Sequence, residues 1–228
     1  MRSISNIFSL FSEKKCYACG QVWHFFCLEC QQKMYHYEPY CYVCKKASEN
    51  FFVHNNCHIW FQLQQVIVFT RYRQNSIKRA LKHAKYYGKY KIYEDMLTQK
   101  WALIWETLSF LEPGILIPVP MHFFRKWKRG YNQAQKIADS LSQVTGLPVE
   151  EKLIVRSRYT KHQSRISQSE RLKNLKDCFK VLQNIYPKDT ICYLIDDVIS
   201  TGATLNECAQ VLQNEGFQDI RAIVIASD

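Results

Sequence analysis

The strongest constraint on the fold is the segment 191–205, where an apolar run meets two acids, a turn of small residues and the start of a helix. Residues 191–195 have the apolar character of a short buried strand. Asp196 and Asp197 follow at its carboxyl end, which is where open α/β folds bind their ligands. This order of features predicts a sheet edge built to bind a small molecule.

The turn after the two acids is suited to an anion. Its small side chains let several backbone N–H groups converge on one phosphate, and the next helix adds the positive end of its dipole. A bound phosphate would place a ribose beside the acids, which accept hydrogen bonds from vicinal hydroxyls. The sequence therefore predicts a ribose 5-phosphate site formed by Asp196, Asp197, Ser200, Thr201, Gly202, Ala203 and Thr204.

Strand-like and helix-like segments alternate along the rest of the chain. This alternation predicts an α/β fold with a mostly parallel sheet and helices on both faces. The expected strands are 66–72, 115–119, 153–156, 191–195 and 220–226, and the expected helices are 76–87, 90–108, 132–145, 169–175 and 203–215.

Seven cysteines lie within the first 60 residues, six of them in Cys-x2-Cys pairs. No stretch approaches the apolar length of a membrane span, and 4–11 is too short for a signal peptide core, so we expect a cytoplasmic protein with reduced thiols. The spacing then favours structural zinc over disulfides, because two such pairs complete a tetrahedral site. We expect a zinc-binding, zinc-ribbon-like module at 1–60 and an α/β domain at 61–228.

The most local ligand set joins the first two pairs, Cys16 with Cys19 and Cys27 with Cys30, because only seven residues separate them. A less complete second site contains Cys41, Cys44 and Cys57, with His54 or His58 as the fourth ligand. A crossed arrangement, in which the first pair shares an ion with the third, remains open on spacing alone. Buried thiols without metal are the alternative for both sets.

Positive charge is concentrated in a few segments of the chain, whose formal net charge is +11. Residues 71–91 contain eight basic residues and no acid, with tyrosines between them, and 125–129 adds four more. Such a pattern suits single-stranded nucleic acid, since cations contact phosphates while aromatic rings stack on bases. Solvated helix faces and core aromatics are the alternative. The nucleic-acid candidates are Arg71, Arg73, Lys78, Lys82, Lys85, Lys126 and Lys128.

Further basic residues are placed to bind a pyrophosphate. Arg125 and Arg129 follow the strand at 115–119, so they lie at the same sheet edge as Asp196. Arg156 and Arg158 begin a long cationic segment that could form a hood over a phosphosugar. Departure of pyrophosphate needs charge neutralisation by Mg2+ or arginine.

Segment 191–205 resembles the 5-phosphoribosyl-1-pyrophosphate (PRPP) signature of type I phosphoribosyltransferases. The order of pieces along the whole chain resembles the ComF family, which includes ComFC and GntX proteins, through RGYNQA at 129–134 and DDVISTGAT at 196–204. The resemblance implies a type I phosphoribosyltransferase-like fold after a double zinc ribbon, and a role in natural transformation.

Two main functions follow as expectations. The first is a competence protein for DNA uptake that binds single-stranded DNA and contains a PRPP-type pocket. The second is an active PRPP-dependent phosphoribosyltransferase of nucleotide metabolism, although no acceptor pocket is recognisable in the sequence. A third is an adaptor that docks a helicase or the DNA-translocation machinery at the inner membrane.

Overall fold

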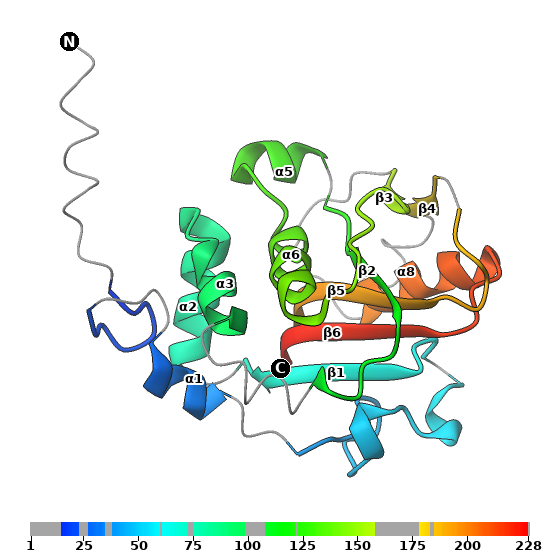
Figure 1. Cartoon of the computed structure of the whole chain (residues 1–228), viewed down its shortest axis with the longest axis horizontal. Coiled ribbons are helices and arrows are strands. Elements are labelled where there is room, and N and C mark those ends of the chain that lie inside the picture. Colours follow the sequence, from blue (N-terminus) through cyan, green and yellow to red (C-terminus); the bar gives the residue numbers. More distant parts are fainter. Residues whose placement is uncertain are drawn as a thin grey trace.

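The computed structural model contains a four-stranded parallel sheet with the order β1-β6-β5-β2 (Figure 1). Its strands are β1 (Gln65–Arg71), β6 (Ile220–Ser227), β5 (Ile191–Ile199) and β2 (Gly114–Pro118). The α/β class with a parallel sheet is therefore confirmed. The structure describes residues 15–22, 27–34, 38–59, 61–72, 75–98, 108–121, 123–157, 178–182 and 185–227.

The two central strands form the core of the sheet. Every residue of β6 is buried, and β5 is buried over most of its length, as expected for parallel strands covered on both faces. Because all four strands are parallel, their carboxyl ends meet at one edge of the sheet. Asp196 and Asp197 of β5 lie toward that edge.

Helices cover both faces of the sheet, as predicted. On one face, α6 (Gln133–Thr145) packs on β2 and β5, α3 (Lys91–Thr98) packs on α6, and α2 (Asn75–Tyr87) packs on α3. Helix α8 (Ala203–Asn214) packs on β5 and β6. Successive side chains of a strand point to opposite faces of the sheet. On β5, Asp197 forms an ion pair with Lys85 of α2, whereas the neighbouring Asp196 interacts electrostatically with Cys208 of α8. Helix α8 therefore lies on the opposite face of the sheet from α2.

Local sequence signals account for the limits of α6. The side chain of Asn132 accepts a hydrogen bond from the Ala134 N–H at the start of the helix. Gly146 ends it in the left-handed conformation, with φ of 74°. Both positions match the limits expected from the sequence.

Several element limits differ from the expectation. Strand β5 continues to Ile199, so Asp196 and Asp197 belong to the strand and do not follow it. The reason is that pairing with β6 continues past both acids, with Val198 opposite Ala226. Helix α3 covers the first part of the expected helix 90–108, and residues 99–107 lie outside the described residues. The expected helix 169–175 lies outside the described residues. Helix α5 (Phe123–Arg129) was not expected.

A small antiparallel sheet stands apart from the parallel one. The segment expected as a strand at 153–156 forms β3 (Ile154–Arg156), which pairs with β4 (Phe179–Val181). Strand β4 packs against α8, so this hairpin lies beside the helix that follows the predicted phosphosugar turn.

Within its described residues, the cysteine-rich segment contains α1 (Leu28–Met34) and the 3-10 helices η2 (Glu49–Phe51) and η3 (Asn55–Cys57). It runs directly onto the sheet. The Val53 N–H donates to the Gln64 carbonyl, the Gln65 amide donates to the Asn50 carbonyl, and the hydroxyls of Tyr40 and Ser227 lie 3.0 Å apart. In the part of the chain that the structure describes, no helix combines the length and apolar character of a membrane span.

Candidate functional site

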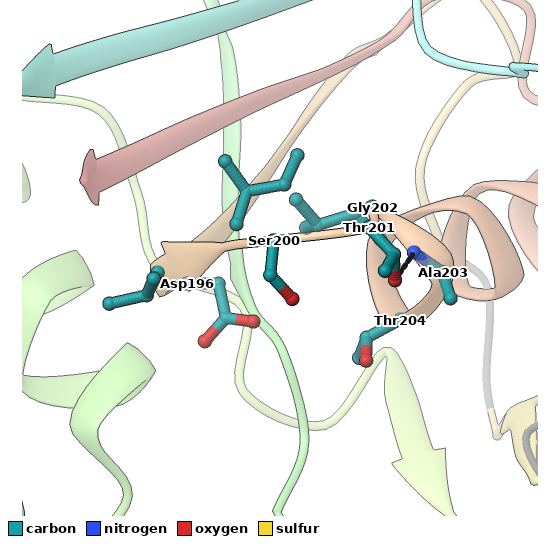
Figure 2. A pocket seen from close by; sticks show the side chains of 9 residues that line it. Asp196, Ser200, Thr201, Gly202, Ala203 and Thr204 are labelled. Carbon is teal, nitrogen blue, oxygen red and sulfur yellow. Dashed lines mark hydrogen bonds between the residues drawn. The ribbon is translucent and has the colours of Figure 1, made fainter. Parts of the chain in front are cut away.

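Residues 200–204, which are the turn after β5 and the first two residues of α8, form the centre of the candidate site and are here named the phosphate loop (Figure 2). Gly202 is in the left-handed region, with φ of 74°, and the start of α8 has no side-chain cap. The Thr201 hydroxyl accepts a 3.4 Å hydrogen bond from the Ala203 N–H. An uncapped helix start leaves N–H donors for an anion, so this loop has the features of a phosphate site.

Asp196 lines the same pocket as the phosphate loop (Figure 2). Burial and then the charge of Asp197 raise the pKa of Asp196 to about 7, although the N–H of Asp197 donates a 2.8 Å hydrogen bond to its carboxylate. Near neutral pH this carboxyl is therefore poised between its acidic and ionised forms. The ionised form offers acceptors to sugar hydroxyls.

Asp197 points to the opposite face of the sheet from Asp196. Its carboxylate lies 3.5 Å from the ammonium group of Lys85 on α2, and the charge of Asp197 raises the pKa of Lys85. Lys85 also interacts electrostatically with Asp196 and Arg129. The structure thus places only one of the two acids in the pocket, and it places Lys85, predicted to bind nucleic acid, at this acidic pair.

The arginines predicted to bind pyrophosphate lie in different surroundings. Arg129, at the end of α5, has its guanidinium 5.8 Å from the ring centre of Tyr86 on α2. Arg156 of β3 stacks over Phe179 at 5.2 Å and acts electrostatically on Cys208 of α8. Arg125 is placed by its backbone in α5, and Arg158 lies outside the described residues.

Comparison with known proteins identifies the carboxyl-terminal half of the chain. The model of the phosphoribosyl transferase domain matches residues 118–228. Competence protein F of Haemophilus influenzae is 39% identical over 111 residues, 48% of either chain. The chain carries a phosphoribosyltransferase domain and is a homologue of the competence proteins. The resemblance to the ComF family that the sequence predicts is confirmed.

Two further homologues extend the comparison. DNA utilization protein YhgH of Escherichia coli O157:H7 is 33% identical over 109 residues, 48% of this chain and 47% of its own. Competence protein ComFC of Bacillus subtilis is 24% identical over 200 residues, 83% of this chain and 78% of its own. The matches to competence protein F and YhgH span about half the length of those proteins.

Ahead of the phosphoribosyltransferase domain, Cys16, Cys19, Cys27 and Cys30 form the first cysteine cluster, with their sulfur atoms within 4.8 Å of one another. Two of the Sγ–Sγ distances, Cys16–Cys30 and Cys19–Cys27, are 3.9 and 3.5 Å. Thiolates bound tetrahedrally to zinc at about 2.3 Å lie about 3.8 Å apart, so the cluster fits zinc. Burial would raise the pKa of Cys16, but hydrogen bonds from backbone N–H groups, led by that of Cys27, lower it to about 7.

The second cysteine cluster consists of Cys41, Cys44, His54 and Cys57, again within 4.8 Å. Cys44 Sγ lies 3.2 Å from His54 Nδ1, which makes His54 the fourth potential ligand. His58 instead has its Nδ1 3.3 Å from the Phe61 carbonyl. The structure therefore groups the ligands locally, as predicted for the first set, and not in the crossed arrangement.

Basic and aromatic side chains are exposed on both α2 and α5. Lys78 and Lys82 are exposed on α2, and Phe123 and Trp127 of α5 are 70% and 78% exposed. Tyr86 and Tyr87 are exposed at the end of α2. Of the remaining candidates, Arg71 is exposed at the end of β1, Lys126 pairs with Glu151 at 3.0 Å, Lys128 is placed only by its backbone, and Arg73 lies outside the described residues.

Sequence reasoning missed two aromatic residues that contact the phosphate loop. The Tyr42 hydroxyl donates a 2.6 Å hydrogen bond to the Ser200 carbonyl, and the ring of Phe61 lies against Gly202. Tyr42 lies between two cysteines of the second cluster and 158 positions from Ser200. Contacts over such a separation have no local signature.

Proposed function

We propose that this protein acts in DNA uptake during natural transformation, binding single-stranded DNA beside a PRPP-type ribose phosphate site. The names of its homologues, competence protein F, ComFC and DNA utilization protein YhgH, support the competence role together with the phosphoribosyltransferase domain. Zinc in both cysteine clusters would be structural, since four protein ligands leave no open position for a substrate.

The main support for DNA binding is the surface of α2 and α5. Unpaired bases need exposed aromatic faces, and the rings of Tyr86, Phe123 and Trp127 are all exposed. Phosphates need cations near these rings, and Lys78 and Lys82 lie on the exposed side of α2. A strand bound across this surface would combine stacking with charge neutralisation and would show little sequence preference.

The same surface adjoins the candidate phosphosugar site. The Arg129 guanidinium lies near the exposed Tyr86 ring and also interacts electrostatically with Lys85. Lys85 in turn pairs with Asp197. A phosphosugar that attracts Lys85 or Arg129 would therefore change the charge available to DNA. This contact is the physical basis for proposing that the two ligands affect each other's binding.

Fluorescence anisotropy of a labelled oligonucleotide tests the proposal, at two salt concentrations and with or without PRPP and Mg2+. We expect salt-sensitive binding, weakened by Lys82→Glu and by Trp127→Ala. Lys188→Glu is the matched control, because Lys188 precedes β5 at the opposite sheet edge and contacts the Glu215 carbonyl. Equal losses in Lys82→Glu and Lys188→Glu would contradict the proposed surface.

An active phosphoribosyltransferase is the second candidate, favoured by the pocket that joins Asp196 to the uncapped start of α8. Release of pyrophosphate from PRPP with a nitrogen nucleophile and Mg2+ would identify it. Asp196→Asn would then abolish the release.

Binding of a helicase or of the translocation machinery, and a cytoplasmic location, stay predictions.

A further inference from the structure

The second cysteine cluster reaches the phosphate loop through Tyr42. This residue follows Cys41 directly, and its hydroxyl donates to the Ser200 carbonyl at 2.6 Å. Its ring packs on the ring of Phe61 with 5.4 Å between centres. The first residue of the loop is thus hydrogen bonded to a side chain held between two potential metal ligands.

Phe61 continues the contact to the next part of the loop. A Cβ on Gly202 would come within 2.8 Å of Phe61 Cε2 and 3.3 Å of Tyr42 Cε1. Beside it, the Gln62 N–H donates a 2.8 Å hydrogen bond to the side chain of Asn206 on α8, and the Gln213 amide donates to the Gln62 carbonyl at 3.3 Å. These contacts hold the loop and both the first and the last turn of α8.

The loop has little restraint of its own on the pocket side. Gly202 adopts the left-handed conformation, α8 has no side-chain cap, and the Thr201–Ala203 hydrogen bond is long at 3.4 Å. Converging N–H groups bind an anion well only when their directions are fixed in advance. The contacts from Tyr42 and Phe61 supply such fixing.

We propose that Tyr42 and Phe61 are positioning residues for the phosphate loop, and that the second cysteine cluster with its metal holds them in place. Metal occupancy at Cys41, Cys44, His54 and Cys57 then sets the affinity for a ribose 5-phosphate group. The ligand part of this inference rests on the proposed phosphosugar site. Without metal, Tyr42 loses its fixed backbone and the loop loses its hydrogen bond at Ser200.

The first cysteine cluster provides an internal control. Its contacts with the rest of the protein include Tyr17, whose ring lies 4.6 Å from that of His83 on α2, and helix α1, which packs on β1. Removing a ligand there disturbs α2 and leaves the contacts of Tyr42 and Phe61 in place. The effect on the phosphate loop is therefore specific to the second cluster.

The test uses the full zinc-loaded chain and two measurements, amide hydrogen exchange of residues 200–205 without ligand and calorimetric binding of ribose 5-phosphate. His54→Ala removes a ligand, His54→Cys restores four ligands, and Cys19→Ala alters the first cluster. Tyr42→Phe removes only the hydroxyl and keeps the ring and the metal site, which guards against a folding defect.

We expect faster exchange in 200–205 for His54→Ala and Tyr42→Phe, and rates close to wild type for His54→Cys and Cys19→Ala. Loss of one hydrogen bond in Tyr42→Phe should weaken ribose 5-phosphate binding about three- to tenfold with zinc content unchanged. Unchanged exchange in both His54→Ala and Tyr42→Phe overturns the inference, as does an equal increase in Cys19→Ala. If wild type binds no ribose 5-phosphate, the proposed pocket fails, and the exchange pattern still decides whether the cluster holds the loop.

Discussion

Replacing Asp196 by Asn tests whether an ionised carboxylate in the pocket holds the ribose hydroxyls. In the free protein, burial and the neighbouring charge of Asp197 raise the pKa of Asp196 to about 7. A ribose that bonds to the ionised form should therefore bind more tightly as the pH rises through neutrality. Asn lacks this titration and has a single carbonyl acceptor.

The size of the effect follows from the fraction of ionised Asp196. With a pKa of about 7, roughly one tenth of the protein has the carboxylate at pH 6 and roughly nine tenths at pH 8. If only that form binds, the association constant rises about tenfold between these values. The phosphate of the ligand also titrates, with a pKa of about 6, but it does so equally with both proteins. The ratio of wild-type to Asp196→Asn affinity isolates the Asp196 contribution.

Calorimetry with ribose 5-phosphate from pH 6 to pH 8 measures this ratio. Asp197→Asn is the matched comparison, because removing the second charge lowers the pKa of Asp196 and shifts the rise to lower pH. A ratio that stays constant over this range would refute the role of an ionised Asp196. An unshifted rise in Asp197→Asn would refute the stated cause of the raised pKa.

Four further outcomes are expected. Because folding raises the pKa of Asp196 from 3.8 to about 7, its contribution to stability is full below about pH 4 and is lost, by about 4 kcal/mol, as the pH rises from there to about 7. Urea unfolding of Asp196→Asn should therefore show a flatter pH profile. Gly202→Ala places a side chain at a left-handed φ and against Phe61, so it should lower the free energy of unfolding by about 2–4 kcal/mol and weaken phosphosugar binding. Gly88→Ala, with φ of 67° and open space around it, should lower the free energy of unfolding by only about 1–2 kcal/mol. Metal analysis should find two zinc ions per chain, with one lost in Cys16→Ser and one in Cys44→Ser, and a single ion in wild type would contradict one of the clusters. Lys85→Met leaves Asp197 without its cation and should reduce phosphosugar affinity more than DNA affinity. A larger loss of DNA affinity would instead indicate that Lys85 binds DNA.

Elements made from contiguous residues were predictable from the sequence. The strand, acids, small-residue turn and helix at 191–214 follow one another directly, so local preferences specify both the fold class and the phosphate loop. The first cysteine cluster was predictable for the same reason, since short loops close it. The limits of α6 were also predictable, because Asn132 caps its start and Gly146 ends it.

Tertiary structure alone decided which distant residues complete the site. Lys85 meets Asp197 and Tyr42 meets Ser200 across separations of more than a hundred residues. Packing of α2 on α3, and of the second cysteine cluster on the sheet, brings them together. The divergence of Asp196 and Asp197 arises from strand pairing, since β6 extends β5 past both acids and a strand alternates its side chains. Local propensity cannot determine these contacts, because they depend on how separate elements pack.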